Sequence, residues 1–181
     1  MVSRSTPAPS WRFTPLREED LPLLERWLLQ PHVRRWWDDR PGKPYPDLSD
    51  YRAAIQGQDP TENFVIRADG RPVGFIETYR IDDDPEYAAA LDLGEPAAGV
   101  DVYLGEPDML HRGNGPELLR VFLREIVFER YGDLCVIGPS NVNVSAIRAY
   151  EKVGFRHFKN VFISGERDPE YLMRLRKQDL S

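Results

Sequence analysis

GVDVYLGEPDMLHRGNGPELLRVFLREIVFERYGDLCVIG, residues 99–138, is the stretch from which the fold of this chain can be inferred. Residues 99–104 alternate between apolar and polar or smaller side chains, which predicts a strand. A turn at 111–116 leads into residues 117–130, whose apolar side chains recur at helical spacing. The continuous apolar run at 134–137 is typical of a central strand. The stretch therefore predicts a strand, a turn, a long amphipathic helix and a second strand.

The turn at residues 111–116 has the properties of a phosphate-binding loop. A helix start leaves backbone N–H groups unpaired at the positive end of the helix dipole, which favours anions. Gly113 and Gly115 allow the backbone to approach a ligand closely. Pro116 suits the first turn of a helix, and Arg112 adds a positive charge. Two glycines before a helix are also found in ordinary tight turns, so the turn alone leaves both interpretations open.

A second strand-and-helix unit follows and connects the chain to a known family. The polar turn from Gly138 to Asn143 precedes a helix that carries Ala146 and Tyr150 and ends at Gly154-Phe155. Together with Gly113-Asn114-Gly115, these residues resemble the acetyl-CoA-binding segments of the Gcn5-related N-acetyltransferase (GNAT) family.

Within that family the chain is most similar to the aminoglycoside 6′-N-acetyltransferases. Gly99-Val100-Asp101 resembles their strand that ends in the catalytic carboxylate, and residues 146–155 are similar to their signature. The family loop begins with Gln or Arg where this chain has Leu110, so Arg112 is expected to substitute. The resemblance extends over most of the chain from Leu21.

The resemblance implies an α/β GNAT fold with a mixed, mostly antiparallel central sheet flanked by helices. It also implies acetyl-CoA as the cosubstrate, in the cleft between two diverging central strands. The residues expected to bind it are Val102, Tyr103, Leu104, Arg112, Gly113, Asn114, Gly115, Pro116, Asn143, Ala146 and Tyr150.

Asp101 is the expected catalytic base. It shares one face of its strand with Tyr103, whereas Val100 and Val102 lie on the other. A carboxylate in the middle of a strand indicates either an exposed face or a site, and the resemblance favours a site. An amine acceptor is protonated at neutral pH, and a nearby carboxylate can orient it and take its proton. Backbone N–H groups near Tyr103 are expected to meet the thioester oxygen.

Two residues of the following helix have alternative interpretations. Asn143 is placed either to cap that helix or to hydrogen-bond an amide of the cosubstrate. Tyr150 would ordinarily be a core aromatic, but in the family a tyrosine here lies beside the CoA sulfur and can protonate the leaving thiolate. We therefore predict Tyr150 as the catalytic acid.

The acceptor is predicted to be a cationic small molecule, such as an aminoglycoside. Ten acidic side chains and one basic side chain lie between Glu77 and Asp108, and a field of that sign would concentrate cations. Glu77 and Tyr79 share one face of a predicted strand. The resemblance adds Trp36, from a paired-tryptophan segment, and Glu86, from the acidic loop. The predicted substrate-binding residues are Trp36, Glu77, Tyr79, Glu86 and Asp101.

Composition sets further limits. The length of 181 residues predicts one domain at residues 11–181, after a flexible tail at 1–10. The net charge of −6 argues against nucleic-acid binding. No apolar stretch approaches the roughly 20 residues of a membrane span, and no signal-peptide pattern opens the chain. We expect a cytoplasmic monomer or homodimer without a metal, because the three histidines show no ligand spacing with the lone Cys135.

The remaining elements follow from local signals. The pattern predicts a short strand at 11–14, an amphipathic helix from Leu21 ended by Pro31, and short helices at 32–37 and 49–55. Asp69-Gly70 predicts a hairpin turn between strands 64–67 and 72–79, with Val73 and Phe75 on one face. A long acidic loop is expected at 82–98 and two final strands at 155–163 and 171–176.

One departure from the aminoglycoside enzymes concerns the acceptor. Those enzymes carry an Asp that contacts the antibiotic where this chain has Gly138, so Glu86 or Glu77 is expected to compensate. Two alternatives therefore stay open. One is an acetyltransferase for a hydroxylamine in siderophore synthesis or for another small amine, although the hydroxylamine families carry a His where this chain has Asp101. The other is a non-enzymatic acyl-CoA-binding domain, which would need neither Asp101 nor Tyr150.

Overall fold

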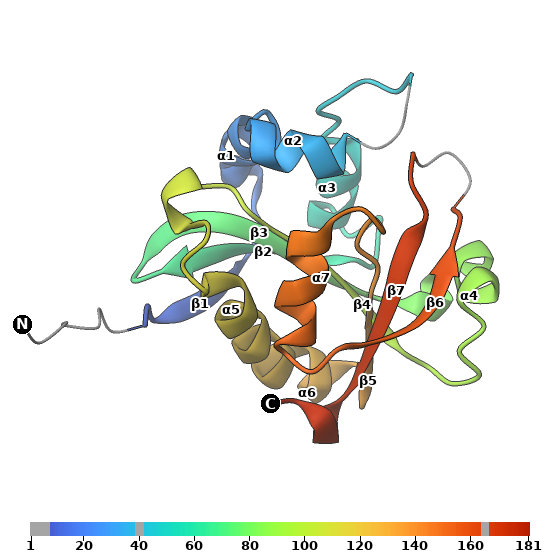
Figure 1. Ribbon diagram of the computed structural model, residues 1–181. Coiled ribbons are helices and arrows are strands. Elements are labelled where there is room, and N and C mark those ends of the chain that lie inside the picture. Colours follow the sequence, from blue (N-terminus) through green and yellow to red (C-terminus); the bar gives the residue numbers. More distant parts are fainter. Residues whose placement is uncertain (1–7, 39–41, 164–166) are drawn as a thin grey trace, which may run out of the picture.

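A single seven-stranded sheet organises the computed structural model, which describes residues 8–38, 42–163 and 167–181 (Figure 1). The strand order is β1-β2-β3-β4-β5-β7-β6, and of the pairs only β4 with β5 is parallel. The expected mixed, mostly antiparallel sheet is confirmed. The strands are β1 Trp11–Pro15, β2 Glu62–Ala68, β3 Arg71–Arg80, β4 Ala98–Leu104, β5 Leu134–Ile137, β6 Arg156–Val161 and β7 Glu170–Arg176.

Helices cover both faces of this sheet (Figure 1). They are α1 Leu21–Leu28, α2 Pro31–Trp37, α3 Ser49–Ile55, α4 Pro85–Leu91, α5 Asn114–Phe122, α6 Phe128–Arg130 and α7 Val144–Glu151. A π-helical turn, Leu123–Val127, joins α5 to α6. None of the helices in these described ranges is long and apolar enough to cross a membrane.

The two faces have separate cores because alternate residues of each strand point to opposite sides. On one face α5, α6 and the π-helical turn pack against side chains such as Phe64, Ile76 and Val100. On the other face α1, α2 and α3 pack against Val65 and the next row of the sheet. At the far end of that same face, α4 packs over β5 and β7. An uncovered stretch of sheet is thereby left between α1–α3 and α4.

The central strands β4 and β5 separate soon after they pair. Their ladder consists of Ala98 with Cys135 and Gly99 with Val136. The carboxyl-terminal part of β4, from Val100 to Leu104, continues along β3 but has left β5. The predicted divergence of the two central strands is therefore present.

Several local predictions need correction. The acidic stretch predicted as a loop contains α4, because Asp84 accepts hydrogen bonds from two backbone N–H groups of its first turn. The long helix begins at Asn114 rather than at residue 117. Pro31 starts α2 rather than merely ending α1, since a first-turn proline needs no hydrogen-bond partner. The predicted tail lies, up to residue 7, outside the described residues.

The β2–β3 hairpin also differs from a regular ladder. Its turn, Asp69-Gly70, has φ angles of 50° and 83°, as a two-residue hairpin turn requires. One extra residue, Val73, interrupts the pairing on β3, so Ile66 faces Gly74 while Arg67 faces Pro72. Val73 and Phe75 consequently pack in different cores, and the prediction that they share a face was wrong.

Candidate active site

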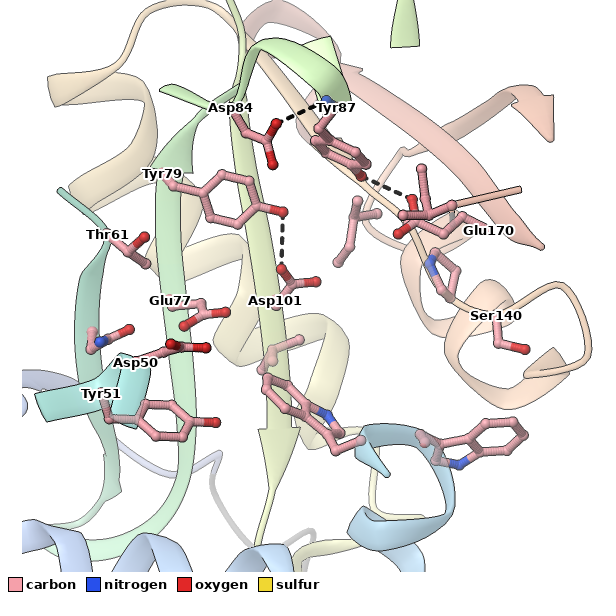
Figure 2. Close-up of a pocket in the computed structure, with 18 of the residues that line it drawn as sticks. Asp50, Tyr51, Thr61, Glu77, Tyr79, Asp84, Tyr87, Asp101, Ser140 and Glu170 are labelled. Carbon is pink, nitrogen blue, oxygen red and sulfur yellow. Dashed lines mark hydrogen bonds between the residues drawn. The ribbon is translucent and has the colours of Figure 1, made fainter. Parts of the chain in front are cut away.

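A cavity of about 630 Å³ lies over the uncovered part of the sheet. Its walls come from α2, α3, α4, the turn after β5 and the start of β7, and its floor comes from β2, β3 and β4. Figure 2 shows carboxylate and tyrosine side chains from these elements converging on the same space. A volume of this size is ordinary for a small-molecule site.

Three paired residues form a polar row across the cavity floor. Asn63 on β2 is opposite Glu77 on β3, and Glu77 is opposite Asp101 on β4. Side chains of directly paired residues lie on the same face, with Cβ atoms about 5 Å apart. All three line the cavity, whereas the next row along the strands is buried under α1, α2 and α3. We refer to Asn63, Glu77 and Asp101 as the polar row.

Asp101 is held by Tyr79. The Tyr79 hydroxyl donates a hydrogen bond to Asp101 Oδ2 at 3.0 Å (Figure 2). The tyrosine ring reaches Asp101 by crossing directly over Gly99, where a Cβ atom would lie 2.3 Å from the ring. Only glycine at position 99 therefore permits this contact. Burial and the neighbouring Asp101 raise the pKa of Tyr79 well above its ordinary value, so its hydroxyl keeps its proton.

Glu77 is in an unusual electrostatic environment. Burial raises the pKa of its carboxyl well above the ordinary value, and the negative charges of Asp101, Asp59 and Asp50 raise it further. Asp50 lies beside Glu77 in the cavity (Figure 2). The floor of the cavity therefore favours a proton or a cation at this point.

The cavity as a whole is acidic. Among the described residues, three arginines line it, Arg35, Arg80 and Arg167. The carboxylates of the described residues that line it number nine, and they are Asp47, Asp50, Asp59, Glu77, Asp83, Asp84, Asp101, Asp168 and Glu170. A concave surface with this balance attracts cations.

The wall formed by α4 and β7 carries a second fixed carboxylate. The Tyr87 hydroxyl donates to Glu170 Oε2 at 2.9 Å (Figure 2). The same oxygen lies 2.4 Å from the place where a Cβ on Gly138 would be. Any side chain at position 138 would therefore displace the Glu170 carboxylate. A backbone bridge between Ser140 and Glu170 joins the turn after β5 to the start of β7.

The helix α7 brings two predicted residues to the cavity. Asn143 is the N-cap of α7 and accepts a hydrogen bond from the Ala146 N–H at 3.2 Å, so its predicted capping role is confirmed. Tyr150 lines the cavity and packs against Phe155, with 6.2 Å between ring centroids. Burial, with a smaller contribution from Asp101, raises the pKa of Tyr150. Its hydroxyl is consequently a proton-bearing donor at neutral pH.

The glycine turn forms the start of α5, as predicted. Gly113 is the N-cap residue and has a φ of 78°, a conformation that favours glycine. The buried Asn114 side chain donates to the Met109 carbonyl at 2.8 Å and so stabilises the turn itself. Arg112 is exposed beside the helix start. Because glycine has no capping side chain, the first N–H groups of α5 are suited to an anionic ligand.

The structure brings most of the predicted acceptor residues together. Trp36, Glu77, Tyr79 and Asp101 line one cavity, and so do the predicted cosubstrate residues Val102, Asn143 and Tyr150. Glu86 is exposed on α4 and does not line the cavity, whereas its neighbour Tyr87 does.

Sequence reasoning missed Asn63, Asp50, Tyr87 and Glu170. Asn63 is recognisable only once the register of the β2–β3 hairpin is known, and Glu170 only once β7 is placed beside β5. Among the described residues, no group of three or more His, Cys, Asp or Glu side chains is arranged to hold a metal ion.

Comparison with known families agrees with this geometry. The model of the acetyltransferase (GNAT) domain matches residues 17–163. The chain belongs to the GNAT acetyltransferase family. It is therefore an N-acetyltransferase, and acetyl-CoA is its cosubstrate.

Individual enzymes of the GNAT family are similar to this chain in sequence and in structure. The chain is 27% identical over 144 residues to aminoglycoside N(6′)-acetyltransferase type 1 of Klebsiella pneumoniae, covering 77% of this chain and 71% of the relative. It is 29% identical over 135 residues to N-hydroxyputrescine acetyltransferase of Acinetobacter baumannii, covering 75% of this chain and 61% of the relative. Among solved structures, aminoglycoside acetyltransferase AAC(6′)-Ib in complex with coenzyme A and kanamycin has a TM-score of 0.73 and 26% identity, covering 94% of this chain and 96% of that chain.

The residues of this GNAT chain fit acetyl-CoA. The split between β4 and β5 opens beside Asn143 and Tyr150, and the uncapped start of α5 offers backbone N–H groups to phosphates. Both features come from the strand-and-helix units that carried the resemblance.

Proposed function

We propose that this protein acetylates a primary amine of a small polycation, most specifically the 6′-amine of an aminoglycoside. One observation carries the proposal: Asp101, fixed by Tyr79, lies in an acidic cavity where β4 and β5 diverge. A carboxylate at that position adjoins both the expected cosubstrate and an incoming ammonium group.

The charges of the cavity support a polycationic acceptor. In the part of the chain that the structure describes, nine carboxylates and three arginines line it, so several ammonium groups on one molecule would find partners there. The similarity to aminoglycoside 6′-acetyltransferases, at 27% identity, supports the same acceptor class.

The residues of the site can perform direct transfer. When bound, acetyl-CoA supplies an acetyl group on a thioester carbonyl. Asp101 takes a proton from the acceptor ammonium, and the freed nitrogen forms a bond to the carbonyl carbon. Backbone N–H groups near Tyr103 stabilise the negative charge that develops on the oxygen. As the carbon–sulfur bond breaks, the Tyr150 hydroxyl would donate its proton to the departing sulfur, and the second proton that the nitrogen loses as the amide forms would restore that hydroxyl.

The glycine at position 138 is compatible with an aminoglycoside acceptor. Aminoglycoside enzymes of this kind carry an aspartate there, and the Glu170 carboxylate occupies the corresponding side-chain space in this protein. Tyr87 holds that carboxylate in the cavity wall. A negative charge is thus supplied from β7 instead of from the turn after β5, and Glu86 and Glu77 need not compensate for Gly138.

A hydroxylamine acceptor is the second candidate, because the chain is 29% identical to an N-hydroxyputrescine acetyltransferase. Such an acceptor is also cationic through its second amine. A hydroxylamine nitrogen is much less basic than an alkyl amine and has little need for a base, so the fixed Asp101 favours the amine.

The proposed function is tested by release of CoA thiol from acetyl-CoA with kanamycin, ribostamycin, spermidine and N-hydroxyputrescine. We expect turnover with an aminoglycoside and a loss of about a hundredfold or more in kcat for Asp101→Asn, the usual contribution of a general base. Turnover with N-hydroxyputrescine alone would support the acetyltransferase activity but show that the acceptor is a hydroxylamine and not an aminoglycoside. Binding of acetyl-CoA without turnover of any amine would indicate an acyl-CoA-binding domain.

A further inference from the structure

We propose that Glu77 and Asn63 form a second ammonium-binding subsite beside Asp101, so that the preferred acceptor carries a second cationic nitrogen close to the nitrogen that is acetylated. The inference rests on the proposed function, since it assumes that the acceptor amine reacts at Asp101. It adds a specificity-determining pair to that reaction.

The polar row provides the geometry. Asn63, Glu77 and Asp101 are consecutive partners across three strands and all line the same cavity. Because directly paired Cβ atoms are about 5 Å apart, ammonium groups on Asp101 and Glu77 would be separated by about 5 to 7 Å. Two amines on one sugar ring, or two amines joined by three or four carbon atoms, span this distance.

The protein supplies no cation to Glu77 within the described residues. The charged or titratable side chains that act on it are all acids and phenols, and they are Asp101, Asp59, Asp50, Tyr51, Tyr79 and Tyr103.

The three described arginines that line the cavity make other contacts. Arg35 lies over the Trp36 ring at 4.7 Å, and Arg80 lies over the Tyr131 ring at 5.3 Å. Arg167 donates to the Asp38 carbonyl at 2.6 Å. Within the described residues, Glu77 therefore has no cationic partner from the protein itself.

Asn63 gives an independent indication of a ligand. The residue is 9% exposed and lines the cavity, yet its side-chain Oδ1 has no hydrogen-bond partner in the described structure. A buried amide oxygen left in this state is costly. An ammonium group has three N–H donors, enough to reach the Glu77 carboxylate and the Asn63 carbonyl together. The raised pKa of Glu77 is consistent with this subsite, because a buried carboxylate among other acids is stabilised by a proton or by a bound cation.

The test compares kanamycin A with kanamycin B, which carry a hydroxyl and an amine, respectively, at the 2′ position of the ring that bears the 6′-amine. For Glu77→Gln we expect the KM for kanamycin B to rise about tenfold or more, while the KM for kanamycin A changes by less than about twofold. Glu125→Gln, which removes an exposed charge outside the cavity, is the matched control and should change neither KM. An equal rise of KM for both kanamycins in Glu77→Gln would overturn the proposal.

Calorimetry gives a readout that a structural role would not move. With the enzyme saturated with CoA, Glu77→Gln should weaken the binding of kanamycin B about tenfold or more and change that of kanamycin A by less than about twofold. An equal Kd for kanamycin B in wild type and Glu77→Gln would overturn the subsite.

Failure of the proposed function has a different signature, namely no acetylation of either kanamycin by wild type. The subsite is then tested by calorimetry with propane-1,3-diamine and propan-1-amine. Tighter binding of the diamine, lost in Glu77→Gln, supports the subsite. Equal binding of the two amines overturns it.

Discussion

Replacing Gly99 by alanine should damage the site through Tyr79. A Cβ at position 99 would lie 2.3 Å from Cε2 and 2.4 Å from Cζ of the Tyr79 ring, well inside van der Waals contact. The ring must therefore move, and its hydroxyl then loses the 3.0 Å hydrogen bond to Asp101. A hydrogen bond to a charged acceptor contributes about 1.5 to 3 kcal/mol. At about 1.4 kcal/mol per factor of ten, Gly99→Ala should lower kcat/KM about 10- to 150-fold.

A double-mutant cycle isolates this cause from a general loss of folding. The three nearest atoms to the added methyl group all belong to Tyr79, so removing the ring relieves the three closest contacts. Gly99→Ala should consequently cost little in a Tyr79→Ala background, although it is severe in wild type. The assay is CoA thiol release with the acceptor identified for wild type, accompanied by thermal denaturation of all four proteins.

Two results would refute this reasoning. One is a Gly99→Ala variant that retains the kcat/KM of wild type. The other is an equal loss from Gly99→Ala in both backgrounds, which would show that Gly99 acts independently of Tyr79.

Three further predictions follow from individual residues. Glu77→Gln should raise Tm relative to wild type more at pH 7.5 than at pH 4. The pKa of Glu77 is raised in the folded protein, so wild type loses stability as the pH rises above the unfolded-state pKa of about 4.3. The Glu77→Gln variant has no carboxyl at this position and does not lose that stability. An equal difference in Tm between the two proteins at both pH values would contradict this prediction. Gly138→Ala should raise the acceptor KM measured by CoA thiol release, because its methyl group displaces the Glu170 carboxylate; in a Glu170→Ser background the same substitution should change that KM by less than about twofold, and an equal rise in both backgrounds would contradict this. Gly113→Ala should raise the KM for acetyl-CoA, because a φ of 78° costs a residue with a side chain about 1 to 2 kcal/mol and so disturbs the turn. Gly132→Ala is the control: its φ of 103° lies beyond the end of α6, so the substitution should lower stability without changing that KM.

Local signals were sufficient for the elements that carry the chemistry. Residues 98–104 form β4, close to the strand predicted at 99–104, and the glycine turn leads into α5 as its composition predicted. The placement of Tyr79 on the face of Glu77 also followed from that period. These features depend on neighbours in the chain, which a sequence displays directly.

The polar row depended on a register that the sequence does not display. The Asp69-Gly70 turn pairs Ala68 with Arg71, and continuing that ladder without interruption would place Asn63 opposite Ile76. The extra residue at Val73 shifts the ladder by one, so Asn63 meets Glu77 instead. A side-chain period read from sequence cannot locate such a bulge.

The cavity wall depended on pairing between distant segments. Glu170 reaches Gly138 only because β7 lies between β5 and β6, an order for which the chain carries no local signal. The helix α4 did have a signal, Asp84 followed by Pro85, but the run of acids around it favoured the interpretation as a loop.

The position of β7 also has a consequence for synthesis on the ribosome. In the described chain β6 pairs only with β7, and β7 is the later of the two to be made. Until it emerges, β5 has an open edge and β6 has no partner, a state in which strand edges can pair with other chains. The nascent enzyme is thus vulnerable to aggregation until β7 has emerged. The same strand delivers Glu170, so the acidic cavity cannot be complete before β7 has been made.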